Sequence, residues 1–103
     1  MGEIADKRVK SYISRVKKAL DAKVILFGSR ARGEPLKESD YDLLVISEKF
    51  EGIPLRERLQ ELYAMMIRSP FNADILALTP REYEELSHKL TIYSEIRKMG
   101  VYA

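Results

Sequence analysis

The sequence predicts an α/β (α+β) fold, with helices packed on a small mixed sheet of three to four strands. The first observation behind this prediction is that helical and extended apolar patterns alternate along the chain, in the order helix, strand, strand, helix, strand, helix. The second is the run LLVI at residues 43–46, which is apolar at every position and is therefore typical of a strand covered on both faces. The length of 103 residues corresponds to a single domain, 1–103.

The predicted helices and strands up to residue 78 come from five segments. Residues 7–23 and 54–69 have apolar side chains at helical spacing with charged residues between them, so each predicts an amphipathic helix. The runs KVILF (23–27), YDLLVI (41–46) and FNADILAL (71–78) predict buried strands. The polar segment between the first two strands contains glycine and proline, and we expect it to be a loop.

The carboxyl-terminal part is expected to be mainly helical. Thr79 is the predicted N-cap of a third helix, with Pro80 at its first position and Glu82 completing a capping box. The pattern after this helix is ambiguous. We interpret it as a helix that runs to about Met99, ends at Gly100 and is followed by a short extended end.

Composition and charge exclude several classes of protein. A hydrophobic content of 46% with 33% charged residues indicates a folded globular chain, and the absence of cysteine excludes disulfides and thiolate metal sites. A net charge of +2 does not support a dedicated nucleic-acid binder, so no direct DNA binding is expected. No apolar run approaches the ~20 residues of a membrane span, and no signal peptide is recognisable. We therefore expect a cytoplasmic protein without a membrane partner.

Two carboxylates, Asp40 and Asp42, stand at the start of the second predicted strand. Residues two apart on a strand point to the same side, so these two side chains should lie close together. Their repulsion would push one of them toward protonation unless a cation offsets it, and hard oxygen ligands suit Mg²⁺. The alternative is a solvated strand end without a functional role.

Two further features favour a metal site over a solvated strand end. Gly28 and Ser29 directly follow the first strand, where a glycine lets a ligand approach the backbone and a serine supplies a hydroxyl to an anion. Asp74 lies in the third apolar run, where an unpaired buried carboxylate is costly. If that strand lies beside the one with Asp42, Asp74 completes a cluster of three carboxylates, which suits metal-assisted phosphoryl or nucleotidyl transfer. The alternative for Asp74 is a salt bridge to an arginine or lysine.

Arg30 stands beside the expected phosphate site. Its guanidinium could neutralise a triphosphate or the pyrophosphate that leaves. The alternative is a surface charge that pairs with Glu34 or Glu38.

These residues resemble a known signature. Gly28-Ser29, followed after ten residues by Asp40-x-Asp42, is similar to the pattern of the DNA polymerase β-like nucleotidyltransferase superfamily. The sequence GSRARGE…SDYDLLV most resembles its minimal members, the MNT proteins encoded beside HEPN-domain partners, and the resemblance covers about residues 24–78. Tyr41 departs from the pattern, because the family more often has an aliphatic residue between the carboxylates.

The resemblance implies a role for each site residue. Ser29 would contact the triphosphate of ATP, and Gly28 would give it room. Asp40 and Asp42 would bind two Mg²⁺ ions. Asp74 would bind one of these ions and act as the base toward the acceptor hydroxyl.

The resemblance also implies a partner. MNT proteins are antitoxins that transfer AMP from ATP to a tyrosine of a HEPN ribonuclease toxin, so we expect a Mg²⁺-dependent protein adenylyltransferase that acts on such a toxin, in a homodimer or hetero-oligomer. Two alternatives stay open: a binding antitoxin that neutralises its partner by contact alone, and an enzyme that adenylylates a small molecule or an RNA end.

Overall fold

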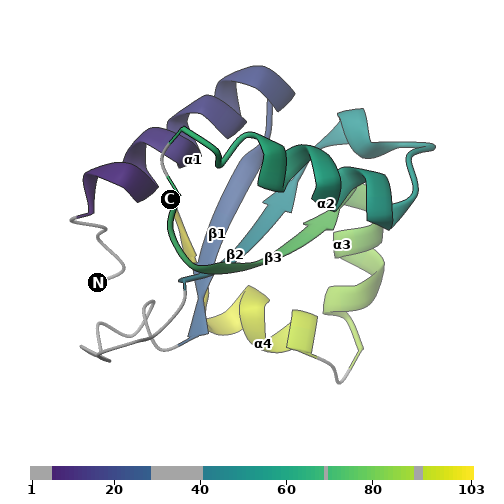
Figure 1. The fold of residues 1–103 in the computed structure, drawn as a ribbon. Helices are drawn as coiled ribbons and strands as arrows, with labels where there is room; N and C mark the ends of the chain where they lie inside the picture. The colour runs from purple at the N-terminus through teal and green to yellow at the C-terminus, as the bar shows by residue number, and fades with distance from the viewer. Residues whose placement is uncertain (1–5, 29–40, 69, 90–91) are drawn as a thin grey trace.

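The computed structural model of the chain describes residues 6–28, 41–68, 70–89 and 92–103. Within these residues, four strands form one mixed sheet in the order β3-β2-β1-β4 (Figure 1). The elements in chain order are α1 (Lys7–Leu20), β1 (Lys23–Phe27), β2 (Tyr41–Ile46), the 3₁₀ helix η2 (Glu48–Phe50), α2 (Leu55–Ala64), β3 (Ala73–Leu78), α3 (Pro80–Ser87), α4 (Ile92–Met99) and β4 (Val101–Tyr102). β1 pairs antiparallel with β2 and β4, and β2 pairs parallel with β3.

The predicted mixed sheet with packed helices is confirmed, and most differences lie at the ends of elements. β1 and β2 have the predicted bounds, whereas α2 ends at Ala64 because the next four residues form a turn. The capping box of α3 is confirmed: the Thr79 hydroxyl accepts from the backbone N–H of Glu82 (3.1 Å), and the Glu82 carboxylate accepts from that of Thr79 (2.8 Å). The short helix η2, which buries Phe50, was not predicted.

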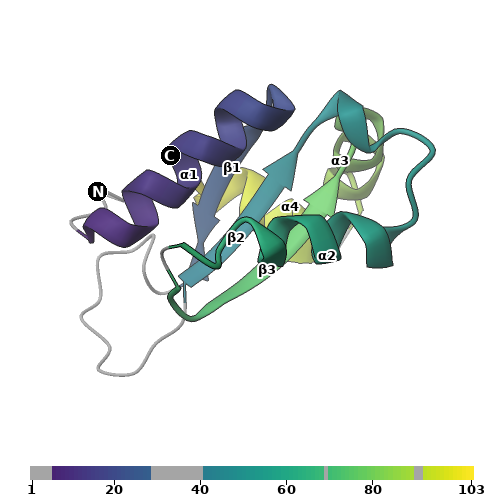
Figure 2. The same ribbon diagram turned by 45° about the horizontal axis from the view of Figure 1, so that its top comes forward.

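Helices cover both faces of the sheet (Figure 2). We call the side that packs against α1 and α2 the α1/α2 face, and the opposite side the α3/α4 face. Successive residues of β2 alternate between the two: Leu43 and Val45 belong to the core of the α1/α2 face, and Leu44 and Ile46 to that of the α3/α4 face. All four are buried, which confirms that the strand is covered on both sides. None of the helices in the described ranges is both long and apolar enough to cross a bilayer.

Arg58 is a buried charge that connects α2, β3 and α3. Its side chain is only 7% exposed, and its guanidinium lies 5.5 Å from the centre of the Phe50 ring. It donates hydrogen bonds to the backbone oxygens of Ile53 (2.7 Å) and Ala77 (3.1 Å) and to both oxygens of the Glu82 carboxylate (2.7 and 3.2 Å). These bonds hold the pKa of Glu82 below its ordinary value, although partial burial works in the opposite direction.

Side chains of α2 also cover the free edge of β3. Alternate backbone groups of an edge strand point away from its only neighbour and need other partners. The carbonyl of Ala73 accepts a hydrogen bond from the Tyr63 hydroxyl (3.1 Å), and that of Ala77 accepts from Arg58 (3.1 Å). Helix α2 therefore holds both ends of β3 in place beside β2.

We predict that Arg58→Met lowers the free energy of unfolding by roughly 2–3 kcal/mol at pH 7, because two backbone carbonyls and a carboxylate lose their donor. Arg56→Met, on an exposed part of the same helix, should cost less than about 0.5 kcal/mol. Urea unfolding of the two variants measures this difference. Equal costs would mean that the buried guanidinium has no special role.

The stabilising effect of Arg58 should also depend on pH. The pKa of Glu82 is lower in the folded chain, so this pair contributes its full stability above the ordinary glutamate pKa of 4.5 and loses it as the pH falls through the lower folded value. The difference in unfolding free energy between wild type and Arg58→Met should therefore shrink below that pH. A constant difference down to acid pH would contradict the role of the Glu82 carboxylate.

Candidate active site

The structure describes three of the six residues that the sequence predicts for the site. Gly28 directly follows β1, Asp42 lies in β2 and Asp74 lies in β3. Ser29, Arg30 and Asp40 lie outside the described residues, so their predicted roles stay predictions.

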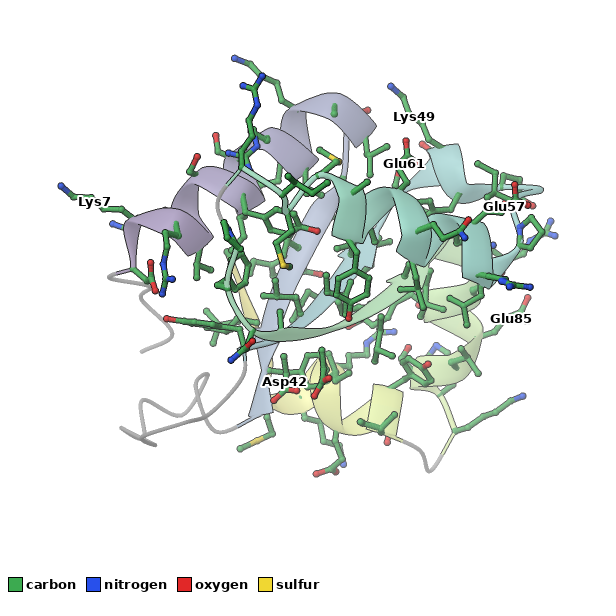
Figure 3. All side chains as sticks on the ribbon, in the orientation of Figure 1. Lys7, Asp42, Lys49, Glu57, Glu61 and Glu85 are labelled. Atoms are coloured by element: carbon green, nitrogen blue, oxygen red, sulfur yellow. The ribbon has the colours of Figure 1, made fainter. Side chains whose placement is uncertain are left out.

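Asp42 and Asp74 lie side by side on neighbouring strands. They are paired positions in the parallel ladder of β2 and β3, whose backbones are about 4.8 Å apart in such a ladder. Paired residues project to the same face, and here it is the α3/α4 face, because Leu44 and Leu76, two residues further along each strand, pack there. In Figure 3 Asp42 projects at the end of the sheet near α4. The carboxylate cluster predicted from the sequence depended on the third strand lying beside the second, and in the structure β3 does lie beside β2.

The expectation that Asp74 is buried is wrong. Asp74 is exposed, because β3 is the outermost strand and Asp74 is only its second residue. An apolar run alone does not distinguish an edge strand from an inner one. The alternative of a salt bridge is not observed either: within the described parts of the chain, Asp74 forms no ion pair. An exposed carboxylate at this position is accessible to a ligand.

Gly28 is held against the carboxylate of Asp42. Its φ of +77° lies in the region that favours glycine. A Cβ added here would overlap Oδ2 of Asp42 and lie 3.2 Å from its Cγ. The sequence predicts that Gly28 leaves room for a ligand, and this stays a prediction; in the structure the Asp42 side chain occupies the space that a Cβ would take. A side chain at position 28 would therefore displace this carboxylate.

The residues at this end of the sheet fit a divalent cation. Asp42 and Asp74 offer hard oxygen ligands on one face, and a cation between them would offset their repulsion. Within the described ranges, no group of three or more acidic, histidine or cysteine side chains is close enough to hold a metal ion. The pair alone would therefore be an incomplete ligand set, and the sequence predicts that Asp40 adds to it.

Aromatic side chains lie behind the carboxylates, on the α1/α2 face, and the sequence did not indicate their arrangement. The Phe71 ring contacts those of Tyr41 and Tyr12 edge-on, with centroids 5.8 and 5.4 Å away. Tyr12 belongs to the helix predicted at residues 7–23 and Phe71 to the strand predicted at residues 71–78, but no contact between them was predicted. The sequence feature that could have indicated these contacts is Tyr41, an aromatic residue where the family more often has an aliphatic one.

Comparison with protein families gives a match to the Nucleotidyltransferase domain over residues 7–100. Two relatives carry the words protein adenylyltransferase in their names. MntA from Haemophilus influenzae is 35% identical over 83 residues, which is 79% of this chain and 72% of that protein. MJ0141 from Methanocaldococcus jannaschii is 33% identical over 95 residues, which is 92% of this chain and 91% of that protein.

Solved structures agree with these sequence matches. A crystal structure from Sulfolobus solfataricus, described as a nucleotidyltransferase, has a TM-score of 0.62 and 26% identity over 77% of this chain and 70% of that one. A second nucleotidyltransferase structure has a TM-score of 0.50 and 25% identity over 80% of this chain and 86% of that one.

We predict that Gly28→Ala is more destabilising than Gly52→Ala. Both glycines have positive φ (+77° and +78°), so each variant should lose about 1–2 kcal/mol for a left-handed alanine. Gly28→Ala should lose about 1 kcal/mol more, because its methyl group displaces the Asp42 carboxylate whereas nothing lies within 4 Å of the corresponding position at Gly52.

Urea unfolding of both variants, alone and combined with Asp42→Ala, separates these two contributions. The additional cost at Gly28 should disappear when the Asp42 carboxylate is removed. The same cost with and without that carboxylate would show that Gly28 is needed for its backbone conformation alone.

Proposed function

The chain belongs to the nucleotidyltransferase domain family, and from this premise we propose that it transfers AMP from ATP to a hydroxyl group of a protein. The observation that most supports the proposal is the pairing of Asp42 with Asp74 on neighbouring strands, directly beside Gly28. Nucleotidyl transfer needs carboxylates at such a place, since the substrate brings several negative charges that must be neutralised.

The two aspartates would have different tasks. Two Mg²⁺ ions, when bound, would stabilise the charges on the attacking and leaving oxygens. Asp42 would hold both ions together with Asp40, and Asp74 would hold one. Asp74 would also accept the proton of the acceptor hydroxyl. The hydroxyl oxygen then bonds to the α-phosphorus of ATP while the bond to pyrophosphate breaks, and pyrophosphate leaves.

The exposure of Asp74 supports a large acceptor. β3 is the outermost strand of the sheet, so the proposed base lies where the hydroxyl of another protein can reach it. Two relatives are named as protein adenylyltransferases, and we extend this acceptor class to the present chain. On the MNT resemblance, we propose a tyrosine of a HEPN-domain toxin as the acceptor, with inactivation of that toxin as the outcome.

A direct test incubates the chain with Mg²⁺, labelled ATP and the HEPN-domain toxin proposed as its partner, followed by mass spectrometry of that partner. The proposal expects one or more AMP groups on a tyrosine. Inhibition of the toxin without a gain in mass would instead support a binding antitoxin. Label on a small molecule or an RNA end, with an unmodified partner, would support the third alternative.

We predict that Asp42→Asn keeps the fold but lowers the rate of AMP transfer at least roughly a thousandfold, because a metal-holding carboxylate is lost. The melting temperature should stay the same or rise, since repulsion between Asp42 and Asp74 falls. Circular dichroism measures the melting temperature, and label transfer measures the rate.

The matched control is Asp21→Asn, the same chemical change at an exposed position after the end of α1. It should transfer AMP at the wild-type rate. Near-normal transfer by Asp42→Asn would remove this residue from the metal site, and its unfolding would favour a purely structural strand end.

A further inference from the structure

Three aromatic residues connect the starts of the two strands that carry Asp42 and Asp74. Phe71 lies between Tyr12 and Tyr41, with ring centroids 5.4 and 5.8 Å away and interplanar angles of 74° and 90°. These are edge-to-face contacts, which have a preferred geometry. The Tyr12 side of this group is firmly held, because Tyr12 is 1% exposed and its hydroxyl donates a 2.7 Å hydrogen bond to the backbone oxygen of Leu62.

The aromatic contacts lie directly next to the carboxylates along the chain. Tyr41 precedes Asp42, and its side chain points to the opposite face of the sheet. Phe71 lies three residues before Asp74, in the segment that leads into β3. The backbone N–H of Tyr41 donates to the oxygen of Asn72 at 3.1 Å. These contacts therefore hold the backbone just before each of the two carboxylates.

Within the described residues, the ladder itself gives the two carboxylates little support from this end. Asp42 and Asp74 are the second residues of their strands, and one register pair, Tyr41 with Ala73, separates them from the strand starts. The segment before β3 is further held by Arg8, whose Nη1 donates to the backbone oxygen of Pro70 at 3.2 Å. The packing of the segment around Phe71 thus contributes to the separation of the carboxylates, together with the hydrogen bond from the Tyr63 hydroxyl to the carbonyl of Ala73.

We infer that Phe71 is a positioning residue for the proposed metal site: its ring, packed between Tyr12 and Tyr41, sets the relative placement of Asp42 and Asp74 and thereby the affinity for a divalent cation. The inference rests on the proposed function, since it concerns the same two carboxylates. Ligands held by packed neighbours bind a cation more tightly than ligands whose support is loose. Nucleotidyltransferases of the MNT type more often have an aliphatic residue at the position of Tyr41, and the contact between the Tyr41 and Phe71 rings explains why this chain has an aromatic one.

The test compares Phe71→Leu with Phe50→Leu in the full chain. Both changes remove a ring that packs on the α1/α2 face, half-buried at Phe71 and fully buried at Phe50, but Phe50 lies in η2, beyond the other end of β2. Mn²⁺ binding without nucleotide is measured by calorimetry and by electron paramagnetic resonance. We expect a Kd for Mn²⁺ raised roughly tenfold in Phe71→Leu and nearly unchanged in Phe50→Leu. Equal effects of the two variants, or none in Phe71→Leu, would overturn the inference.

A conservative pair at position 41 gives a second readout. Tyr41→Phe keeps the ring that contacts Phe71 and should retain the wild-type affinity for Mn²⁺, whereas Tyr41→Leu should weaken it as Phe71→Leu does. If both variants bind Mn²⁺ like the wild type, the aromatic contact does not position the carboxylates and the inference fails.

Binding and transfer are measured separately, so the two proposals can fail independently. If Phe71→Leu weakens Mn²⁺ binding and Phe50→Leu does not, but the wild-type chain transfers no AMP, the proposed function is contradicted and the inference stands. If the wild-type chain transfers AMP but the two variants bind Mn²⁺ equally well, the inference alone is contradicted. A wild-type chain that binds no Mn²⁺ would overturn the inference.

Discussion

The parallel pairing of β2 with β3 is the constraint on which the candidate site depends. In this register Asp42 lies opposite Asp74, and both side chains project to the α3/α4 face. A shift of one residue would send one carboxylate to the other face, because side chains alternate along a strand. Two like charges side by side are unfavourable by themselves, so the pairing must be stabilised by the rest of the fold. A cation bound between the two carboxylates would remove this repulsion, so the repulsion would favour cation binding.

Contacts at both ends of β3 stabilise this pairing. At the far end, Arg58 binds the carbonyl of Ala77 and the Glu82 carboxylate, which fixes α2 and α3 against the strand. At the near end, Tyr63 binds the carbonyl of Ala73, and the Phe71 ring packs between α1 and the first residue of β2. The helices on the α1/α2 face therefore align carboxylates that point away from them. On that opposite face α3 and α4 cover the strands, and Asp74, near the start of β3, remains exposed.

Local signals in the sequence predicted the elements well, and signals that join distant residues did not. The capping box at Thr79 depends on residues three apart and was predicted correctly. The pairing of Asp42 with Asp74 joins residues 32 positions apart and could only be stated as a condition. The exposure of Asp74 was missed because strand order cannot be read from an apolar run. Arg58 was missed because a charged residue on a helix is typical of a solvated face, and its partner lies 24 residues away.

The most direct test of the central claim is a crystal structure of the chain with Mn²⁺ and a non-hydrolysable ATP analogue, with the metal located from its anomalous scattering. Our account predicts a peak within about 2.2 Å of carboxylate oxygens from both Asp42 and Asp74, with the α-phosphate of the analogue next to it. A bound analogue whose metal contacts neither aspartate would contradict the assignment of these two side chains as the catalytic pair.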